Sequence, residues 1–270
     1  SFSDLIRISG LSHGTDVWAG NAQVYIKTKQ ATLSEVIACR DDIMISLIQK
    51  GVDNKTAFKI MEKVRKGKGI DENDESILKK VNMPQWFLSS CKSIKYLFPK
   101  AHAAAYVSMA FRIAYFKVHH PLAFYATFFS VKGDEFNLAV VLKGKEAMRS
   151  RITFIRSQEQ DPKKKNEAVV LELAIEMVLR GFSFLTVDLY KSDSFNFTLE
   201  GQSLRVPFIA IPNLGQKAVE KIVAARKDGE FRSIEDLVQR TSINKTNVET
   251  LKEMGVLKGM PDSNQMGLFG

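Results

Sequence analysis

The pattern of hydrophobic and polar positions predicts a mainly helical chain, with its most apolar stretch near the middle. From 103 to 118 only Ser108, Arg112 and Lys117 are clearly polar, apart from two tyrosines. A helix that is apolar nearly all round is normally buried. The two basic residues interrupt the run before the ~20 apolar residues that a membrane span needs. Because Pro121 is well placed to open a second helix, the pattern predicts a buried helical hairpin.

The N-terminal stretch predicts a short helix over residues 1–8, followed by the turn-rich loop SGLSHGTD. Most loops of this kind only connect elements. The alternative is a loop that presents Ser9, His13 and Asp16 to a ligand, and the residues alone favour the connector.

The apolar positions from 31 to 50 predict one helix that begins at a Thr32 or Ser34 cap. Asp41 and Asp42 interrupt its inner face. Neighbouring residues on a helix point about 100° apart, so these carboxylates cannot easily share one metal ion. Ion pairing or helix capping is the favoured role for them.

The rest of the chain predicts helices with one change of period. Residues 71–95 predict two helices that are separated near Pro84, and 135–159 and 166–180 predict two more, joined by an exposed DPKKKN loop. From 182 to 208, alternating β-forming residues predict three short strands.

The segment AIPNLGQKAVEKIVAAR predicts a helix, a tight turn at Pro212–Gly215 and a second helix. This resembles a helix-hairpin-helix unit, in which backbone N–H groups at the turn approach a DNA phosphate. Residues 243–257 resemble a degenerate partner unit, with Asn244-Lys245 in place of the glycine turn. An ordinary helical subdomain is the alternative. The expected DNA-contacting residues are Asn213, Gly215, Lys217, Lys221 and Lys245.

Composition narrows the classes of protein. The 270 residues allow one large or several small domains, 45% hydrophobic residues indicate a globular chain, and the net charge of +9 suits a polyanionic partner. Cys39 and Cys91 make no disulfide framework or zinc spacing, and SFSDLIRISG is no signal peptide. We therefore expect a cytoplasmic protein without a membrane association, and a sequence that begins as if cut from a longer one.

Positive charge is densest between 51 and 68, where six lysines and arginines face two acidic residues. Such a run is usually a solvated helix face. Within it, VRKGKG places cations beside two glycines, which can form a flexible cradle for phosphate oxygens. The G-x-x-x-x-G-K-[ST] spacing of a Walker A loop is absent.

The stretch FPKAHAAAYVSMAFRIAYFKVHHPLAFY resembles, without gaps, the fingers segment of bacterial C-family replicative DNA polymerases, and it is most similar to the PolC type. The resemblance covers most of the chain, and VDLYKS continues it. It implies four parts: the nucleotide-binding side of the fingers at 1–133, a helical continuation at 134–181, a duplex-binding domain at 182–258 and a flexible, clamp-binding tail at 259–270.

The resemblance also implies ligands and site residues. It implies an enzyme that adds deoxynucleotides to a primer by phosphoryl transfer with two Mg²⁺ ions. The palm carboxylates that hold those ions match nothing here, so we expect this segment to be inactive alone and to bind no metal. The residues expected at triphosphate or primer–template phosphates are Arg40, Lys63, Arg65, Lys66, Lys68 and Lys100. Those expected around the base and sugar are Ser9, His13, Phe98 and His102.

The last residues, QMGLF, resemble the Q-x-x-L-F peptide that binds the bacterial β sliding clamp. The contacts would be made by Gln265, Met266, Leu268 and Phe269. Two other functions fit the sequence. One is a non-catalytic DNA-binding module tethered to the clamp, and the other is a repair protein or nucleotidyltransferase whose metal ligands would be Asp41 and Asp42.

Overall fold

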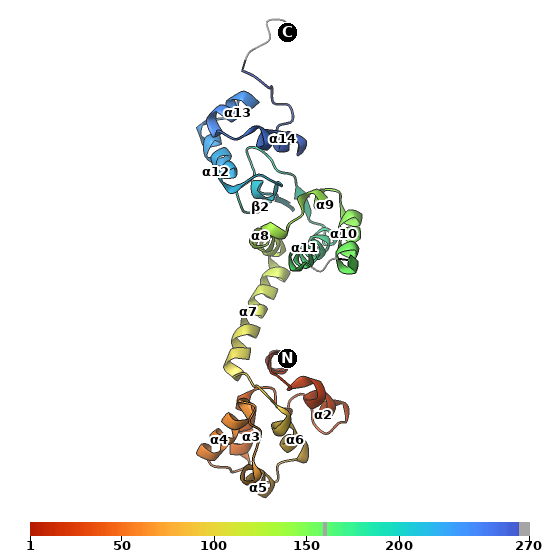
Figure 1. The fold of residues 1–270 in the computed structure, drawn as a ribbon, viewed down its shortest axis with the longest axis vertical. Helices are drawn as coiled ribbons and strands as arrows, with labels where there is room; N and C mark the ends of the chain where they lie inside the picture. Colours follow the sequence, from red (N-terminus) through yellow and green to blue (C-terminus); the bar gives the residue numbers. More distant parts are fainter. Residues whose placement is uncertain (159–160, 265–270) are drawn as a thin grey trace. The chain divides into compact units, whose positions relative to one another are not determined.

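The residues that the computed structural model describes are 1–158 and 161–264, and they are mainly helical, with one small sheet and connecting loops (Figure 1). The mainly α fold with a small α+β region is therefore confirmed. The chain divides into two units, Ser1–Ala114 and Tyr115–Gly270, with separate hydrophobic cores. The boundary lies inside one helix. The division into four parts by function stays a prediction.

The first unit contains six α-helices before the boundary helix, together with a short π-helical segment at Trp18–Ala22. Its core is built mainly from the inner faces of α3, α4, α5 and α6, where Ile43, Leu47, Ile60 and Leu78 are fully buried. The helices are α1 (Phe2–His13), α2 (Gln23–Lys27), α3 (Arg40–Gln49), α4 (Asn54–Arg65), α5 (Glu72–Lys80) and α6 (Gln85–Ser93). As predicted, α5 and α6 are separated near Pro84.

The first helix is longer than predicted. α1 continues to His13, so Ser9 and His13 lie on a helix and not in a loop. The glycine that suggested a turn is required by packing: a Cβ on Gly10 would lie 2.6 Å from the Ala38 carbonyl oxygen. Gly10 thus lets the helix backbone approach the segment before α3.

The predicted helix over 31–50 is also wrong in its first half. Thr32 forms a local turn instead, because its backbone N–H and its hydroxyl both donate to the Glu35 carboxylate, each at 2.7 Å. α3 begins only at Arg40, where Asp42 accepts from the backbone N–H groups of Ala38 and Cys39 at 3.0 and 2.9 Å. Capping is therefore the role of this carboxylate, as expected.

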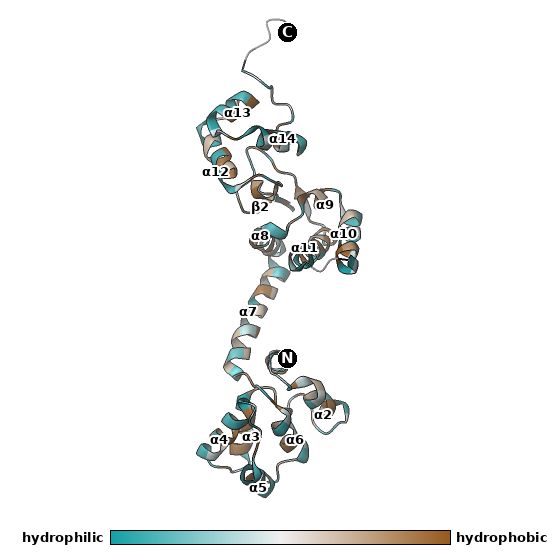
Figure 2. Cartoon of the chain, viewed as in Figure 1, coloured by the Kyte–Doolittle hydropathy of each residue, from teal (hydrophilic) through white to brown (hydrophobic). Residues whose placement is uncertain are grey.

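The two helices predicted for the hairpin are present as α7 (Lys100–His119) and α8 (Pro121–Val131), but they do not pack along each other and the first is not buried. Only Ala103 of α7 is buried, while Tyr106 and Val118 are 58% and 66% exposed. Figure 2 shows hydrophobic residues along this helix. A hydrophobic pattern shows that a helix can be buried, but not that the chain supplies a surface to cover it.

The second unit surrounds α8. Tyr125 and Phe129 of this helix are fully buried, and the Tyr125 hydroxyl donates to Glu176 at 2.7 Å. α8 is followed by α9 (Leu138–Leu142), α10 (Lys145–Gln158) and α11 (Pro162–Leu179). The expected helix over 135–159 is thus two helices, and the predicted DPKKKN loop is wrong from its proline onward, because α11 begins at Pro162.

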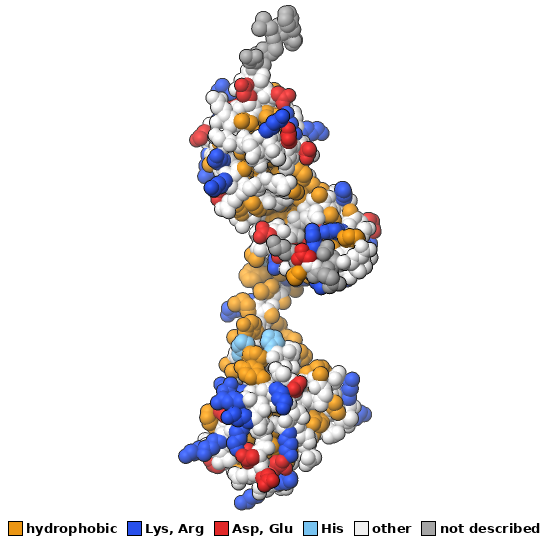
Figure 3. Space-filling model, viewed as in Figure 1, with side chains coloured by type: hydrophobic (Ala, Val, Ile, Leu, Met, Phe, Trp, Pro, Cys, Tyr) orange, Lys and Arg blue, Asp and Glu red, His pale blue; other side chains and the backbone are white. Residues whose placement is uncertain are grey.

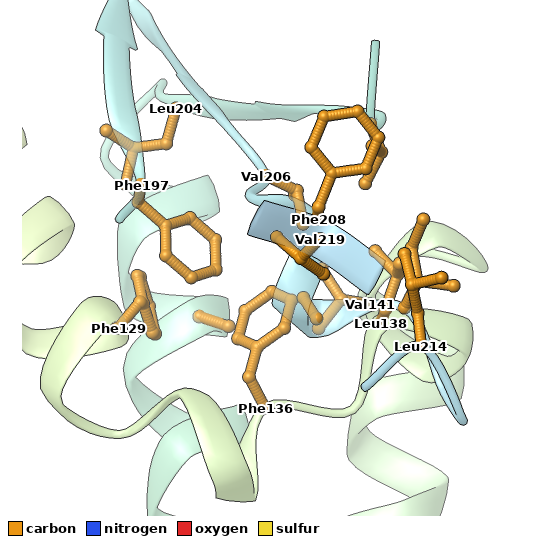
Figure 4. Close-up of a cluster of buried hydrophobic side chains, with 14 of the residues drawn as sticks. Phe129, Phe136, Leu138, Val141, Phe197, Leu204, Val206, Phe208, Leu214 and Val219 are labelled. Carbon is orange, nitrogen blue, oxygen red and sulfur yellow. The ribbon is translucent and has the colours of Figure 1, made fainter. Parts of the chain in front are cut away.

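The three predicted strands are present as one sheet in the order β1-β3-β2. β1 (Ser183–Leu185) pairs parallel to β3 (Ser203–Arg205), and β2 (Thr198–Glu200) pairs antiparallel to it. Figure 4 shows Phe129, Phe136 and Phe197 together in the core beneath this sheet, with Phe136 and Phe197 ring centres 4.8 Å apart.

The last helices are α12 (Gln216–Ala225), α13 (Ile234–Thr241) and α14 (Lys245–Glu253). The helix predicted before the first turn is only a short 3₁₀ segment at Phe208–Ala210. The described part of the tail is held in place, because Pro261 and Asp262 accept from the first backbone N–H groups of α13 at 2.9 and 3.0 Å. The expected mobility therefore does not apply to these residues. No helix of the described residues is long and apolar enough to span a membrane.

Candidate functional site

An aromatic and histidine cluster lies where α1 ends and α7 begins. Phe98 stacks on His102, with ring centres 4.8 Å apart and planes 17° apart, and His102 lies 4.6 Å from the Tyr106 ring. His13 approaches Phe98 at 6.0 Å, and Tyr96 meets the same ring edge-on at 5.0 Å. The structure therefore brings together three of the four residues predicted for a base and sugar pocket. Ser9 lies one turn before His13 on α1.

The backbone explains why these rings meet. Thr15 and Tyr96 form an isolated antiparallel bridge, in which the Thr15 N–H donates to the Tyr96 carbonyl at 3.0 Å. Gly14 permits this approach, because a Cβ there would lie 2.9 Å from the same carbonyl oxygen. The bridge joins the end of α1 to the strand-like segment that leads into α7.

The cluster presents flat surfaces to solvent. His13 is exposed, Phe98 and His102 are half-buried, and Tyr106 is 58% exposed. Aromatic rings held in this way can stack on a nucleic acid base of any sequence. The sequence reasoning missed Tyr96 and Tyr106. The signal for Tyr106 was its position four residues after His102, which places both on one helix face.

A second cluster gathers cations around one carboxylate. Glu62 accepts from Arg65 Nε at 2.7 Å and from Arg65 Nη2 at 2.9 Å. Lys66 Nζ lies 3.1 Å from Oε2 of the same carboxylate, and Arg40 Nη1 lies 3.7 Å from its Oε1. These bonds, led by those from Arg65, lower the pKa of Glu62 to about 2. Three of the residues predicted to bind phosphate thus share one acidic partner, which the sequence reasoning missed.

The segment before α7 connects the two clusters. The Phe98 carbonyl oxygen accepts a hydrogen bond from the Arg40 backbone N–H at 3.1 Å, and the Leu97 N–H donates to the Arg65 carbonyl at 3.3 Å. The Lys100 backbone N–H donates to Asp41 at 2.7 Å. The cations at the start of α3 and the end of α4 therefore lie beside the aromatic rings. Figure 3 shows lysine and arginine side chains gathered near histidine and hydrophobic side chains on this unit.

Lys63 has a different environment from its neighbours. Its ammonium lies 2.6 Å from Asp71 and 2.8 Å from Asp74, the two residues of the α5 capping box. These hydrogen bonds, first that to Asp71, raise the pKa of Lys63. The ion pairs join the end of α4 to the start of α5, which is a structural role. Phosphate binding by Lys63 stays a prediction.

Lys68 and Lys100 lack such ion pairs. Across residues 1–158 and 161–264, neither ammonium forms a salt bridge within 4.0 Å of a carboxylate. Lys68 is exposed and follows Gly67, whose φ of +72° and close approach to the Lys95 carbonyl exclude a side chain. The predicted glycine cradle therefore brings Lys68 back toward the strand-like segment before α7.

The hairpin region offers a second surface. The first turn has a left-handed residue, Asn213 (φ +63°), and Gly215 is the N-cap of α12. Lys217 and Lys221 are both exposed and lie one turn apart on that helix. The side chain of Lys245, the first residue of α14, is 91% exposed.

The two hairpin turns are linked. The largely buried Asn247 donates from its side-chain amide to the Asn213 carbonyl at 3.4 Å, and its backbone N–H donates to the Asn244 side chain at 2.8 Å. The second turn is also left-handed, at Ser242 (φ +51°). Both turns are therefore held by one asparagine.

No group of three or more His, Cys, Asp or Glu side chains in the described parts of the chain could hold a metal ion. Asp42 caps α3, and Asp41 accepts from Lys100 and lies 4.0 Å from Arg40 Nε. Both carboxylates therefore have structural partners. The residues predicted to bind the sliding clamp, 265–269, lie outside the described residues.

Comparison with known proteins first defines the class. Residues 1–83 match the model of the bacterial DNA polymerase III alpha subunit finger domain, and residues 181–266 match a helix-hairpin-helix motif. Fingers and a hairpin domain in this order are those of a bacterial replicative polymerase subunit.

The relatives identify the family. The chain is 57% identical over 270 residues to the PolC-type DNA polymerase III of Thermotoga maritima, and 54% identical over 271 residues to those of Listeria innocua and Bacillus subtilis. The whole chain is matched each time, and it belongs to the PolC-type DNA polymerase III family. It spans only 20% or 19% of the length of these relatives.

Proposed function

We propose that this chain is the part of a replicative DNA polymerase that binds the incoming deoxynucleoside triphosphate and the template–primer duplex. The proposal rests mainly on one observation. At residues 96–102 of the first unit, aromatic rings lie beside lysines that form no salt bridge with a carboxylate of the described chain. Similarity to PolC-type polymerases over the whole chain supports it.

In the nucleotide site, Phe98 and His102 provide the stacking surface for the base or sugar, with His13 at its edge. Lys68 and Lys100 supply positive charge that no carboxylate of the described chain neutralises. Arg65 adds a guanidinium fork, which matches phosphate geometry in two parallel hydrogen bonds. The rings hold one end of the nucleotide while the cations hold the other.

In the duplex site, the α12 N-terminus and the turn before it bind a DNA phosphate. A Cβ on Gly215 would meet nothing within 4 Å, and its φ of −67° suits any residue. Neither packing nor backbone strain therefore requires glycine here, whereas a phosphate approaching the backbone N–H groups would. Lys217, Lys221 and Lys245 add contacts that read no sequence.

Catalysis in the whole polymerase requires Mg²⁺, which supplies charge stabilisation at the transferring phosphoryl group. We infer that the ligands lie outside this chain, which contributes binding and positioning and is inactive alone. We also propose that Gln265, Met266, Leu268 and Phe269 tether the polymerase to the β sliding clamp, and that the protein works on chromosomal DNA in the cytoplasm.

The test is hydrogen exchange of the chain with and without primer–template DNA and deoxynucleotide. The proposal expects protection at residues 9–14, 62–68 and 96–102 when nucleotide is added, and at 212–221 when DNA is added. Protection at 212–258 alone would indicate a DNA-binding module without a nucleotide site. That second function is favoured by the exposed lysines of the hairpins.

A further inference from the structure

Both carboxylate oxygens of Glu62 are occupied. Arg65 holds Oε1 through Nε and Oε2 through Nη2, and Lys66 Nζ lies 3.1 Å from Oε2. Arg40 approaches Oε1 at 3.7 Å from the start of α3. One negative charge thus lies among three positive charges that come from two helices.

This arrangement resembles an anion-binding site in which the Glu62 carboxylate takes the place of the anion. A guanidinium accepts a carboxylate and a phosphate with the same pair of N–H donors. A phosphate that used this fork of Arg65 would have to take the place of Glu62. The side chain of Glu62 is 20% exposed, and those of Arg40 and Lys66 are 34% and 52% exposed, so the carboxylate has a route into solvent.

We propose that Glu62 is an internal competitor for the triphosphate: it neutralises Arg40, Arg65 and Lys66 while the site is empty, and it yields them to the nucleotide. This inference rests on the nucleotide-binding function proposed above. Without a ligand, three neighbouring cations would repel one another. Glu62 holds them in the positions from which they later bind the phosphate oxygens.

The competitor also selects the ligand by charge. A ligand with one weak negative charge gains little by replacing a carboxylate that is already well bonded. A diphosphate or triphosphate brings several charged oxygens, which reach Lys68 and Lys100 as well. Glu62 therefore lowers the affinity for every phosphate ligand, and only polyphosphates still bind well.

The experiment measures binding of deoxyadenosine triphosphate and of pyrophosphate, both with Mg²⁺, to the 270-residue chain by calorimetry. Glu62→Gln removes the charge and keeps the shape, and it should tighten binding of both ligands about fivefold, the size that a few exposed ion pairs together supply. The control is Glu75→Gln, because Glu75 is paired with Lys79 and Lys92 on the α5 side and has a similar side-chain exposure of 23%. That variant should leave both affinities within twofold of the wild type.

A second measurement avoids any effect of the substitution on folding. In the wild-type chain, the side-chain carboxyl ¹³C signal of Glu62 should move toward that of an exposed glutamate when pyrophosphate saturates the site. The Glu75 signal should stay unchanged. A Glu62 signal that does not respond to bound pyrophosphate would overturn the inference.

Arg65→Ala separates this inference from the proposed function. If Arg65→Ala weakens triphosphate binding but Glu62→Gln does not tighten it, the competitor role fails and the nucleotide site stands. If the wild-type chain binds neither ligand, the proposed nucleotide site fails, and the competitor role fails with it.

Discussion

Phe98 is the residue on which the proposed nucleotide site depends most directly, because its ring contacts His13, Tyr96 and His102. Phe98→Ala should weaken deoxynucleotide binding by about 1–3 kcal/mol, the range found when a ring that stacks on a base is removed. Fluorescence titration with a labelled deoxynucleotide would measure it. Phe58→Ala removes a 50% exposed ring from α4, outside the cluster, and should have no effect. Equal losses in both variants would contradict a stacking role.

Glu62 should also make stability depend on pH. Its folded-state pKa of about 2 lies below the ordinary 4.5, because Arg65 and Lys66 hydrogen-bond the ionised form. Its contribution is therefore fully present above pH 4.5 and is lost as the pH falls toward 2. Glutamine does not ionise, so the wild type should be more stable than Glu62→Gln above pH 4.5, and the difference in melting temperature should shrink on acidification. A difference that grows as the pH falls would show that the sign is wrong.

At the scale of elements, the contact between α1 and the segment before α3 depends on a missing side chain. Gly10→Ala would place a Cβ 2.6 Å from both the Ala38 carbonyl oxygen and the Cys39 sulfur. It should destabilise the first unit by about 1–3 kcal/mol, as overpacking does. Gly133→Ala is the matched control, since a Cβ there meets nothing within 4 Å. Urea unfolding would measure both, and an unchanged midpoint for Gly10→Ala would contradict the packing described.

The lysines of α12 belong to the same scale. Lys217→Ala combined with Lys221→Ala should lower duplex DNA affinity and reduce the slope of log affinity against log salt by about 2, because each phosphate contact releases roughly one counterion. Fluorescence anisotropy at several salt concentrations would measure this. Lys80→Ala removes an exposed lysine at the end of α5 and is the control, because a loss of DNA affinity as large as that of the α12 variant would show that any loss of positive charge has the same effect.

Elements with local signals were predicted well from the sequence. Pro84 and Pro121 mark helix starts that the structure confirms, and the three short strands were visible in their alternation. The errors at 9–13 and 31–39 share one physical cause. The glycine inside α1 indicates a turn when only the sequence is known, because its contact with Ala38 is tertiary. The Thr32–Glu35 spacing is also ambiguous, since it can close a turn as readily as it caps a helix.

The sequence predicted which residues gather at the candidate site better than it predicted which of them form ion pairs. His13, Phe98 and His102 meet as expected, yet no sequence pattern indicated that Lys63 is paired with Asp71 and Asp74. Ion pairs between helices depend on how those helices pack, and this is tertiary information. The burial of α7 was mispredicted for the same reason, because periodicity describes one helix and not its surroundings.

At the scale of the molecule, the two units have separate cores and should respond separately to core damage. Ile60→Ala and Phe129→Ala each empty a fully buried site, in the first and second unit respectively, and should each cost about 2–5 kcal/mol. Hydrogen exchange should show faster exchange only in the unit that carries the substitution. Equal acceleration in both units by either variant would mean that the chain unfolds as one cooperative body.

The burial of Cys39 and Cys91 gives the molecule a practical property. Both side chains are free and buried, and loss of solvent raises the pKa of the Cys39 thiol to about 12 and that of Cys91 further still. Since the thiolate is the reactive form, maleimide reagents should leave the native chain unlabelled at neutral pH. A cysteine introduced at exposed Lys227 would then be the single labelling point, so that a fluorophore could report DNA arriving at the hairpins without a background from the natural thiols.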